Sequence, residues 1–300
     1  MTAAALHRGR LDAIQAVLEL HSHRKARSVL DGGYASVFRG RGIDFEDLRE
    51  YVPGDPVGDI DWKATARAGK PLVRNYRQER KNHVLLIVST GRSMTAVAPD
   101  GTPKHELALD VAGVFAHLAV RHRDVVGAVF GDAEEQAAVR GRGGRDHAEH
   151  VLSVLAAAAS DHDGVVSDLA AVLDMAVKAH PPKGIAVLIT DDAVLGPEGE
   201  RSLALLHARH EVMVVRIADM HLAAPEAVAP FDVETGLRLP EEIRLNPSVL
   251  AEAESLAQGE AQAIERALGA EGIAHGRLTG QDALVDTLID LLERHRRRGR

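Results

Sequence analysis

From residue 84 onward the sequence alternates short apolar runs with longer amphipathic segments. The runs at 84–89, 125–130, 184–192 and 211–219 are rich in Val, Ile, Leu and Ala, which is typical of strands covered on both faces. The segments between them repeat apolar residues every three or four positions, as helices do. Strand–helix alternation over this length predicts an α/β fold with a doubly wound, mainly parallel sheet.

The remaining elements of this region follow from the same reading. A short run at 136–139 is expected to return as a hairpin partner of the strand before it, and a last short strand is expected at 274–278. Apolar spacing and breaker residues predict helices at 147–159, 167–180, 202–210, 248–268 and 282–298. The proline-containing stretch between residues 220 and 247 shows little periodicity and is expected to be mostly loop.

The first 80 residues have a different character. Leu11, Ile14 and Leu18 form the stripe of an amphipathic helix, which we expect to end before Asp31-Gly32-Gly33. The next fifty residues are dense in Gly, Arg and Asp and predict short helices at 45–51 and 60–67 and a strand at 72–78. We therefore divide the chain into a lead-in at 1–80 and an α/β domain at 81–300.

Composition limits the classes of function. A net charge of −8 argues against a general nucleic-acid-binding surface, which needs a basic footprint. The absence of cysteine excludes disulfides, thiolate metal sites and cysteine nucleophiles, and it suits a reducing compartment. No segment has the length and apolarity of a signal peptide or a membrane span. We expect a soluble, cytoplasmic protein without a membrane span.

Three polar turns follow predicted strands or precede predicted helices: Ser89–Ser93, Gly164–Asp168 and Thr190–Asp192. Because parallel strands place their carboxyl ends at one edge of the sheet, we expect these turns to meet there. Hydroxyl and carboxylate oxygens are the ligands that Mg²⁺ or Mn²⁺ prefers. Helix capping is the alternative explanation, since Ser167 ahead of a helix is a natural N-cap.

A catalytic interpretation uses the first turn differently. The sequence Gly91-Arg92-Ser93-Met94-Thr95 after a strand resembles a nucleophile elbow, with Asp191 and His275 following in the order found in α/β hydrolases. The second glycine of that motif is a threonine here, and no glycine-rich oxyanion segment precedes the turn. A serine hydrolase using Ser93 is thus the alternative function.

Two consecutive motifs carry a family resemblance. The segments GRGIDFEDLREYVPGD, which begins at Gly40, and IDWKATARAGKPLVRNY, which begins at Ile60, resemble the signature of the domain-of-unknown-function 58 family. The residues that match this signature and that we take as its functional set are Asp44, Phe45, Arg49, Tyr51, Pro53, Gly54, Asp55, Asp61, Trp62 and Arg67.

Large apolar groups are interleaved with charges in this signature. Phe45, Tyr51 and Trp62 need a common surface, so we expect the signature to pack against the sheet domain. Arg49 and Arg67 are expected to hold the neighbouring acids through charge-assisted hydrogen bonds.

The resemblance also implies a fold and a site. Members of the family resemble von Willebrand factor A domains, whose metal-ion-dependent adhesion site (MIDAS) is built from three turns. In this chain the first turn's acid and its two hydroxyls correspond to Ser89, Gly91 and Ser93, the second turn's threonine to Ser167, and the third turn's acid to Asp191. The resemblance therefore implies a degenerate adhesion site that binds Mg²⁺ weakly or not at all through Ser93, Ser167 and Asp191. If Arg92 fills the vacancy, the pocket attracts a partner's carboxylate directly.

The resemblance further suggests a partner. Family members are commonly encoded with MoxR-type AAA+ ATPases, which implies a chaperone-associated role in assembling or activating other proteins. We expect a non-enzymatic protein–protein interaction module without a required cofactor.

Overall fold

The computed structural model of the chain describes residues 11–12, 14–15, 24–39, 47–53, 55, 57–75, 81–159, 165–179, 181–192, 195–220, 232–238, 240 and 246–298. Contacts divide the chain into two compact units. One comprises Met1–Val37 with Asn82–Arg300, and the other comprises Phe38–Lys81. Each unit is described by itself below.

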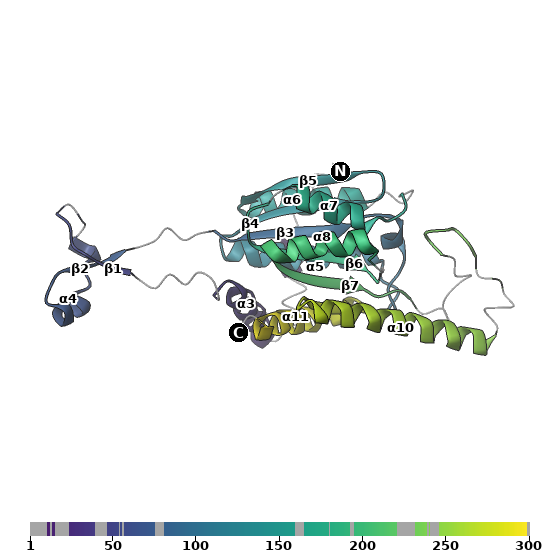
Figure 1. The fold of residues 1–300 in the computed structure, drawn as a ribbon. Coiled ribbons are helices and arrows are strands. Elements are labelled where there is room, and N and C mark those ends of the chain that lie inside the picture. Colours follow the sequence, from purple (N-terminus) through teal and green to yellow (C-terminus); the bar gives the residue numbers. More distant parts are fainter. Residues whose placement is uncertain are drawn as a thin grey trace. The chain divides into compact units, whose positions relative to one another are not determined.

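Six of the described strands form one sheet in the larger unit, in the order β5-β4-β3-β6-β7-β8 (Figure 1). They are β3 (His83–Ser89), β4 (Val125–Gly131), β5 (Gln136–Gly143), β6 (Ile185–Asp191), β7 (Glu211–Ile217) and β8 (Ala274–Leu278). All neighbouring strands are parallel except β4 and β5, which form an antiparallel hairpin. The predicted mainly parallel α/β sheet and its hairpin partner are confirmed.

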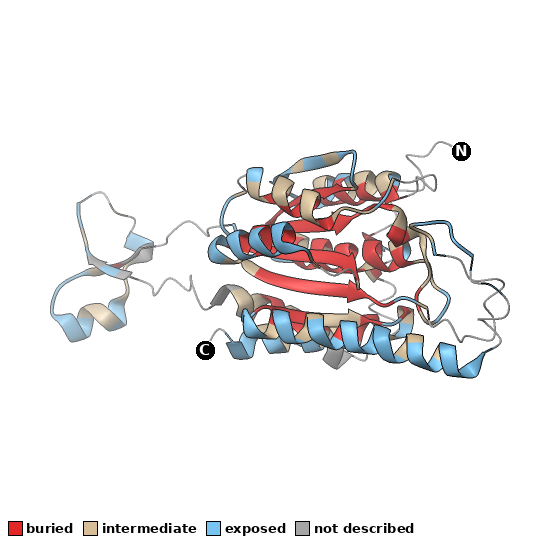
Figure 2. Cartoon of the chain, turned by 45° about the vertical axis from the view of Figure 1, so that its right-hand side comes forward, coloured by how far each residue is buried: buried red, intermediate tan, exposed pale blue. Residues whose placement is uncertain are grey.

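Helices cover both faces of this sheet. The helices are α5 (Lys104–Arg121), α6 (Arg145–Ala159), α7 (Leu169–Lys178), α8 (Pro197–Arg209), α10 (Pro247–Ala270) and α11 (Leu284–Arg298). One core cluster joins the sheet to apolar side chains of α7, α8 and α10, whereas α5, α6 and α11 lie on the other face. The inner strands are buried on both faces, as their continuous apolar sequence predicts, while most of α10 is exposed (Figure 2).

The sheet has a topological switch point between β3 and β6. The chain leaves β3 toward β4 on one side, and after β6 it continues to β7 on the other side. Crossover connections that diverge in this way leave a crevice at the carboxyl ends of the two central strands, which is where open α/β sheets place ligands. The turns that follow β3 and β6 therefore flank the position that fold geometry favours for a site.

A helix runs through the place where the sequence suggested a helix end. Helix α3 (Arg24–Arg39) includes Asp31-Gly32-Gly33, so the helix end predicted before these residues is wrong, while Leu18 lies outside the described residues. Gly33 is in contact range of α11, where an added Cβ would lie 3.1 Å from the Cβ of Leu292. The buried hydroxyl of Tyr34 donates a hydrogen bond of 2.9 Å to Asp124. This packing outweighs the low helix propensity of two glycines.

The smaller unit is a two-stranded sheet with one helix. Strands β1 (Asp47–Glu50) and β2 (Leu72–Asn75) pair antiparallel, and α4 (Trp62–Ala68) lies between them in sequence, after a 3₁₀ turn at Val57–Asp59. The helix predicted at 45–51 is wrong over 47–50, because pairing with β2 satisfies that backbone instead. The helix predicted at 60–67 is confirmed in position as α4, with slightly shifted ends, and the strand predicted at 72–78 is confirmed over 72–75, since residues 76–78 lie outside the described residues.

Candidate functional site

Two of the expected site residues meet at the switch point. Ser93 lies in the 3₁₀ turn η2 (Arg92–Thr95) after β3, and Ser167 lies just before α7. Their Oγ atoms are 2.8 Å apart, and the Ser93 backbone N–H donates a 3.0 Å hydrogen bond to the Ser167 hydroxyl. The backbone N–H of Arg92 also donates to the carbonyl of Val165 at 2.8 Å. Three hydrogen bonds thus join the first two predicted turns.

Ser167 is free for this contact because its neighbour caps the helix. Asp168 is the N-cap of α7, and its carboxylate accepts a 3.0 Å hydrogen bond from the Ala171 N–H. The capping role considered for Ser167 therefore belongs to Asp168. A carboxylate at this position also suits the positive end of the helix dipole.

The same packing explains the glycine at position 91. Its φ of −70° is accessible to every residue, so its backbone conformation does not require glycine. An added Cβ, however, would lie 2.5 Å from both Cα and Oγ of Ser167. Position 91, which the family resemblance matches to the first hydroxyl of an adhesion site, thus has no room for a side chain.

Asp191 of the third predicted turn forms a buried ion pair with Lys104, which the sequence did not reveal. Asp191, at the end of β6, lies 3.6 Å from the Nζ atom of Lys104, the first residue of α5. The same ammonium contacts Asp219 after β7 at 2.5 Å. Lys104 is only 1% exposed, whereas the Asp219 side chain is 56% exposed. A buried cation at a helix N-terminus is unfavourable unless it is paired, and Asp191 and Asp219 together provide that compensation.

The neighbouring carboxylate is held by arginines. Asp192 accepts hydrogen bonds from Arg216 Nη1 at 2.9 Å and from Arg277 Nε at 2.7 Å. Arg216 is buried and also donates to Glu265 at 3.0 Å. Burial lowers the pKa of Arg216, and the two carboxylates oppose that shift. Asp192, the last residue of the third turn, is therefore held on the β7–β8 side of the sheet.

A further segment reaches the same edge from far along the sequence. Both carboxylate oxygens of Glu234 accept from the Ser167 backbone N–H, at 3.2 and 3.4 Å. The Glu234 carbonyl accepts a 3.2 Å hydrogen bond from Arg92 Nη1. No motif pointed to this residue, because it lies in a stretch without periodicity.

The other two residues of the expected adhesion site, Ser89 and Asp191, lie in the same part of the fold. Ser89 ends β3 and is 3% exposed, and β6, which ends at Asp191, is in contact with η2. Among the described residues no group of three or more His, Asp or Glu side chains could hold a metal ion.

The residues of a hydrolase triad do not come together. His275 is the second residue of β8 and lies in register with Val214 of β7, hence at the level of mid-strand and not of the carboxyl edge. Three strand spacings separate β8 from β3, which amounts to about 14 Å. The Nδ1 atom of His275 instead lies 3.1 Å from the carbonyl of Ile273. Ser93 thus has Ser167, and not this histidine, as its neighbour.

The family-signature residues occupy the smaller unit. Asp61 is the N-cap of α4 and accepts from the N–H groups of Lys63 and Ala64 at 3.0 and 2.9 Å. Asp55 accepts a 2.9 Å hydrogen bond from the Val52 N–H. Trp62 is 66% exposed. Tyr51, Pro53 and Arg67 are also described, as is the backbone of Arg49, whereas Asp44, Phe45 and Gly54 lie outside the described residues.

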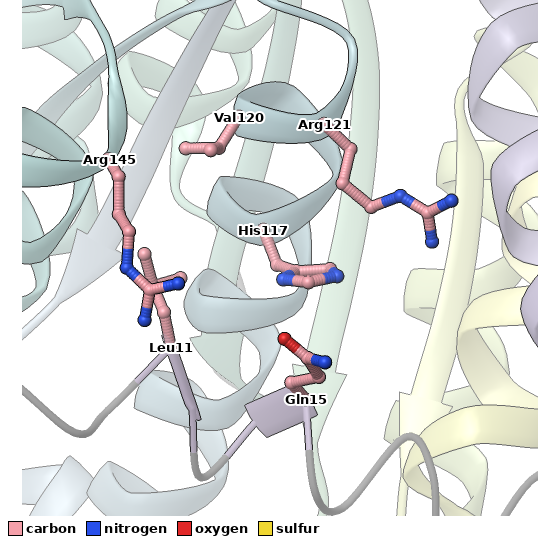
Figure 3. A pocket seen from close by; sticks show the side chains of 6 residues that line it. All are labelled: Leu11, Gln15, His117, Val120, Arg121 and Arg145. Carbon is pink, nitrogen blue, oxygen red and sulfur yellow. The ribbon is translucent and has the colours of Figure 1, made fainter.

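A hollow of about 300 Å³ lies elsewhere, between residues 11–15 and α5 (Figure 3). Its two guanidinium groups already face acids: Arg121 lies 2.8 Å from Asp31, and Arg145 lies 2.6 Å from Asp12. The lining residues are Leu11, Gln15, His117, Val120, Arg121 and Arg145. The hollow is separate from the carboxyl edge of the sheet at which the turns with Ser93, Ser167 and Asp191 lie, called the three-turn edge below, and both of its guanidinium groups are paired.

The fold and this edge define a class: a doubly wound α/β protein with a polar site at its β3–β6 switch point. Residues 47–239 match the family model described as "Protein of unknown function DUF58". The chain belongs to that family, and the expected family membership is confirmed.

Proteins similar to this chain occur in mycobacteria. Uncharacterized proteins of Mycobacterium tuberculosis and Mycobacterium bovis are 32% identical over 214 residues, an alignment that covers 70% of this chain. It covers 66% of each relative, so the chain spans just under two thirds of their length.

Solved structures with a similar arrangement include an aerotolerance-related membrane protein from Bacteroides fragilis, with a TM-score of 0.43 and 14% identity over 71% of this chain and 98% of that one. A von Willebrand factor type A protein from Catenulispora acidiphila has a TM-score of 0.41 and 13% identity over 71% of this chain and 42% of that one. Among the residues described here, no helix combines the length and apolarity needed to cross a membrane.

Proposed function

We propose that this chain is a non-enzymatic protein-interaction module that works with a MoxR-type AAA+ ATPase in the assembly or activation of other proteins. The observation that carries the proposal is that the polar groups at the three-turn edge are already paired with other groups of this chain. Ser93 is paired with Ser167, Asp191 with Lys104, and Asp192 with two arginines. An enzyme of this class needs an activated nucleophile or base, whereas recognition needs only fixed polar groups.

The proposed module recognises its partner without a metal ion, at an adhesion site that has degenerated. In a metal-dependent site, anionic ligands compensate the ion for its lost hydration shell. Here the one acid that corresponds to such a ligand, Asp191, faces the ammonium of Lys104, and position 89 offers a hydroxyl. A second cation beside this ammonium would be repelled, so the donor set suits a built-in positive charge better than Mg²⁺.

The ATPase partnership rests on family membership and on the polar edge. It places the protein in the cytoplasm, where ATP is available to the partner. The serine-hydrolase alternative draws no support from the geometry, since the distance between β8 and β3 separates its base from its nucleophile.

Affinity capture from native lysate of the source organism tests the proposal. The tagged chain should retain an AAA+ ATPase, identified by mass spectrometry, and the amount should differ between ATP and ADP. Arg92→Glu at the edge should reduce that capture. Arg266→Glu provides the matched control, because Arg266 is an exposed arginine of α10 near the opposite end of the sheet. Capture without any AAA+ protein in either nucleotide would refute the partnership.

A fluorophosphonate probe tests the enzymatic alternative. The wild-type chain should remain unlabelled, because the hydroxyl of Ser93 is bonded to Ser167 and to no base among the described residues. Covalent labelling that disappears in Ser93→Ala would instead favour the hydrolase.

A further inference from the structure

A short turn at residues 232–238 is shaped by its own hydrogen bonds. The carboxylate of Asp232 accepts from the Glu234 N–H at 2.9 Å and from the Thr235 hydroxyl at 2.8 Å. The backbone closes the turn, since the N–H of Gly236 donates to the Asp232 carbonyl at 2.7 Å, and the N–H of Asp232 donates to the carbonyl of Leu237 at 2.8 Å. Gly236 has φ of 69°, a conformation that favours glycine. The turn is thus a preorganised unit that presents Glu234.

The group that it presents is seated at the three-turn edge. The Glu234 carboxylate is bonded to the Ser167 N–H, and the carbonyl of the same residue is bonded to the Arg92 guanidinium. Ser167 in turn touches Ser93 through its hydroxyl. Glu234 therefore contacts the second turn directly and the first turn through Arg92.

The chemistry around this carboxylate is selective for an anion. Ser167 offers a backbone N–H one residue before the N-cap of α7, where the helix dipole favours negative charge. Arg92, whose guanidinium is bonded to the Glu234 carbonyl, adds a cation whose planar fork suits carboxylates. A carboxylate from this chain already occupies the place.

We propose that the three-turn edge binds an acidic side chain of a protein partner, and that Glu234 is a built-in ligand which the partner's acid displaces. This inference rests on the proposed interaction function and names the chemistry of its partner. A tethered ligand competes at a high effective concentration, so it lowers the apparent affinity for an outside acid until it is removed.

The amide of Ser167 reports the occupancy of the site directly. In wild-type protein its hydrogen exchange should be slow and its ¹H resonance shifted by the charged acceptor. Glu234→Gln should increase that exchange rate about tenfold or more, since a hydrogen bond to a charged group is replaced by one to a neutral amide. Glu252→Gln on exposed α10 is the matched control and should leave this amide unchanged. An unchanged Ser167 amide in Glu234→Gln would overturn the assignment.

A peptide tests whether an outside acid can take the same place. The probe is a fluorescent peptide of residues 230–240, PFDVETGLRLP, added to a variant in which residues 232–237 are replaced by a Gly/Ser segment of equal length. We expect binding at least about tenfold tighter than to wild type, and loss of that gain in a peptide with Glu replaced by Gln. Equal binding of the Glu and Gln peptides would refute the inference. Capture of the ATPase would then still support the proposed function, so the two failures are distinguishable.

Discussion

Replacing Lys104 with methionine removes a buried positive charge at nearly constant side-chain volume. The carboxylate of Asp191, itself 7% exposed, then loses the cation that lies 3.6 Å away. At an effective dielectric constant of about 20, that separation corresponds to roughly 4–5 kcal/mol of attraction. The half-exposed Asp219 regains water and contributes little.

Two further contributions set the size of the expected loss in the free energy of unfolding. Leaving one member of a buried pair uncompensated typically costs about 3–5 kcal/mol, while removing a cation from a helix N-terminus returns roughly 0.3–1 kcal/mol. We therefore expect Lys104→Met to lower the free energy of unfolding by about 2–5 kcal/mol. For a unit of this size the midpoint of thermal unfolding should fall by roughly 10 °C.

The assay is thermal and urea denaturation followed by circular dichroism. Lys178→Met is the matched control, because Lys178 pairs with Asp174 at 2.5 Å but its side chain is 70% exposed. That control should cost less than about 1 kcal/mol. The double variant Lys104→Met/Asp191→Asn should recover a substantial part of the loss, since no charge is then left uncompensated. A Lys104→Met protein within about 1 kcal/mol of wild type would refute the argument that this pair neutralises the edge.

Four other outcomes are expected. Calorimetric titration with Mg²⁺ or Mn²⁺ should show no micromolar binding to wild type, and binding that Asp191→Ala abolishes would count against the metal-free site. Gly91→Ser should lose about 1–3 kcal/mol in urea denaturation, because its Cβ collides with the neighbouring turn, whereas Gly259→Ala on exposed α10 should be neutral or stabilising. Burial lowers the pKa of His210, so this residue takes up a proton less readily in the folded protein than in the unfolded chain, where it does so near pH 6.5. The free energy of unfolding should therefore fall as the pH drops below about 6.5, by up to about 1.4 kcal/mol per pH unit for this residue, and a urea midpoint independent of pH between 7.5 and 5.5 would contradict this. The packing of the signature on the sheet domain stays a prediction, and a fully water-exposed emission spectrum of Trp62 in the native protein would refute it.

The sheet was predictable because its strands are buried on both faces and therefore apolar without interruption. The short helices and strands of the first 80 residues were harder to predict from the sequence. Residues 47–50 have no strong strand pattern, and only their pairing with β2, more than twenty positions later, makes them a strand. Similarly, Gly32 and Gly33 look like a helix end until the contact with α11 is known.

The candidate site was also predictable from the sequence only in part. Ser93 and Asp191 could be placed at the sheet edge from the sequence, because each lies at or after the carboxyl end of a predicted strand. In this fold class the carboxyl ends of the parallel strands meet at one edge. The contacts of each side chain depend on three-dimensional geometry, which the spacing of residues along the sequence does not reveal. The sequence therefore could not show that Asp168, and not Ser167, caps α7. A lysine opening a helix, as Lys104 does after Pro103, is the one available signal of a buried pair, because that position favours acids.

The order of the strands has a consequence for how the chain folds during synthesis. Central strands β3 and β6 pair in register from Val84 with Ile185, about a hundred positions apart in sequence. At a synthesis rate of roughly 5–20 residues per second, β3 waits on the order of 5–20 seconds for its central neighbour. In that interval it can pair only with β4, which the hairpin to β5 covers on the other side. The β3 edge that β6 later occupies is thus an apolar, unpaired strand edge on the nascent chain, and this is where a holding chaperone would be needed.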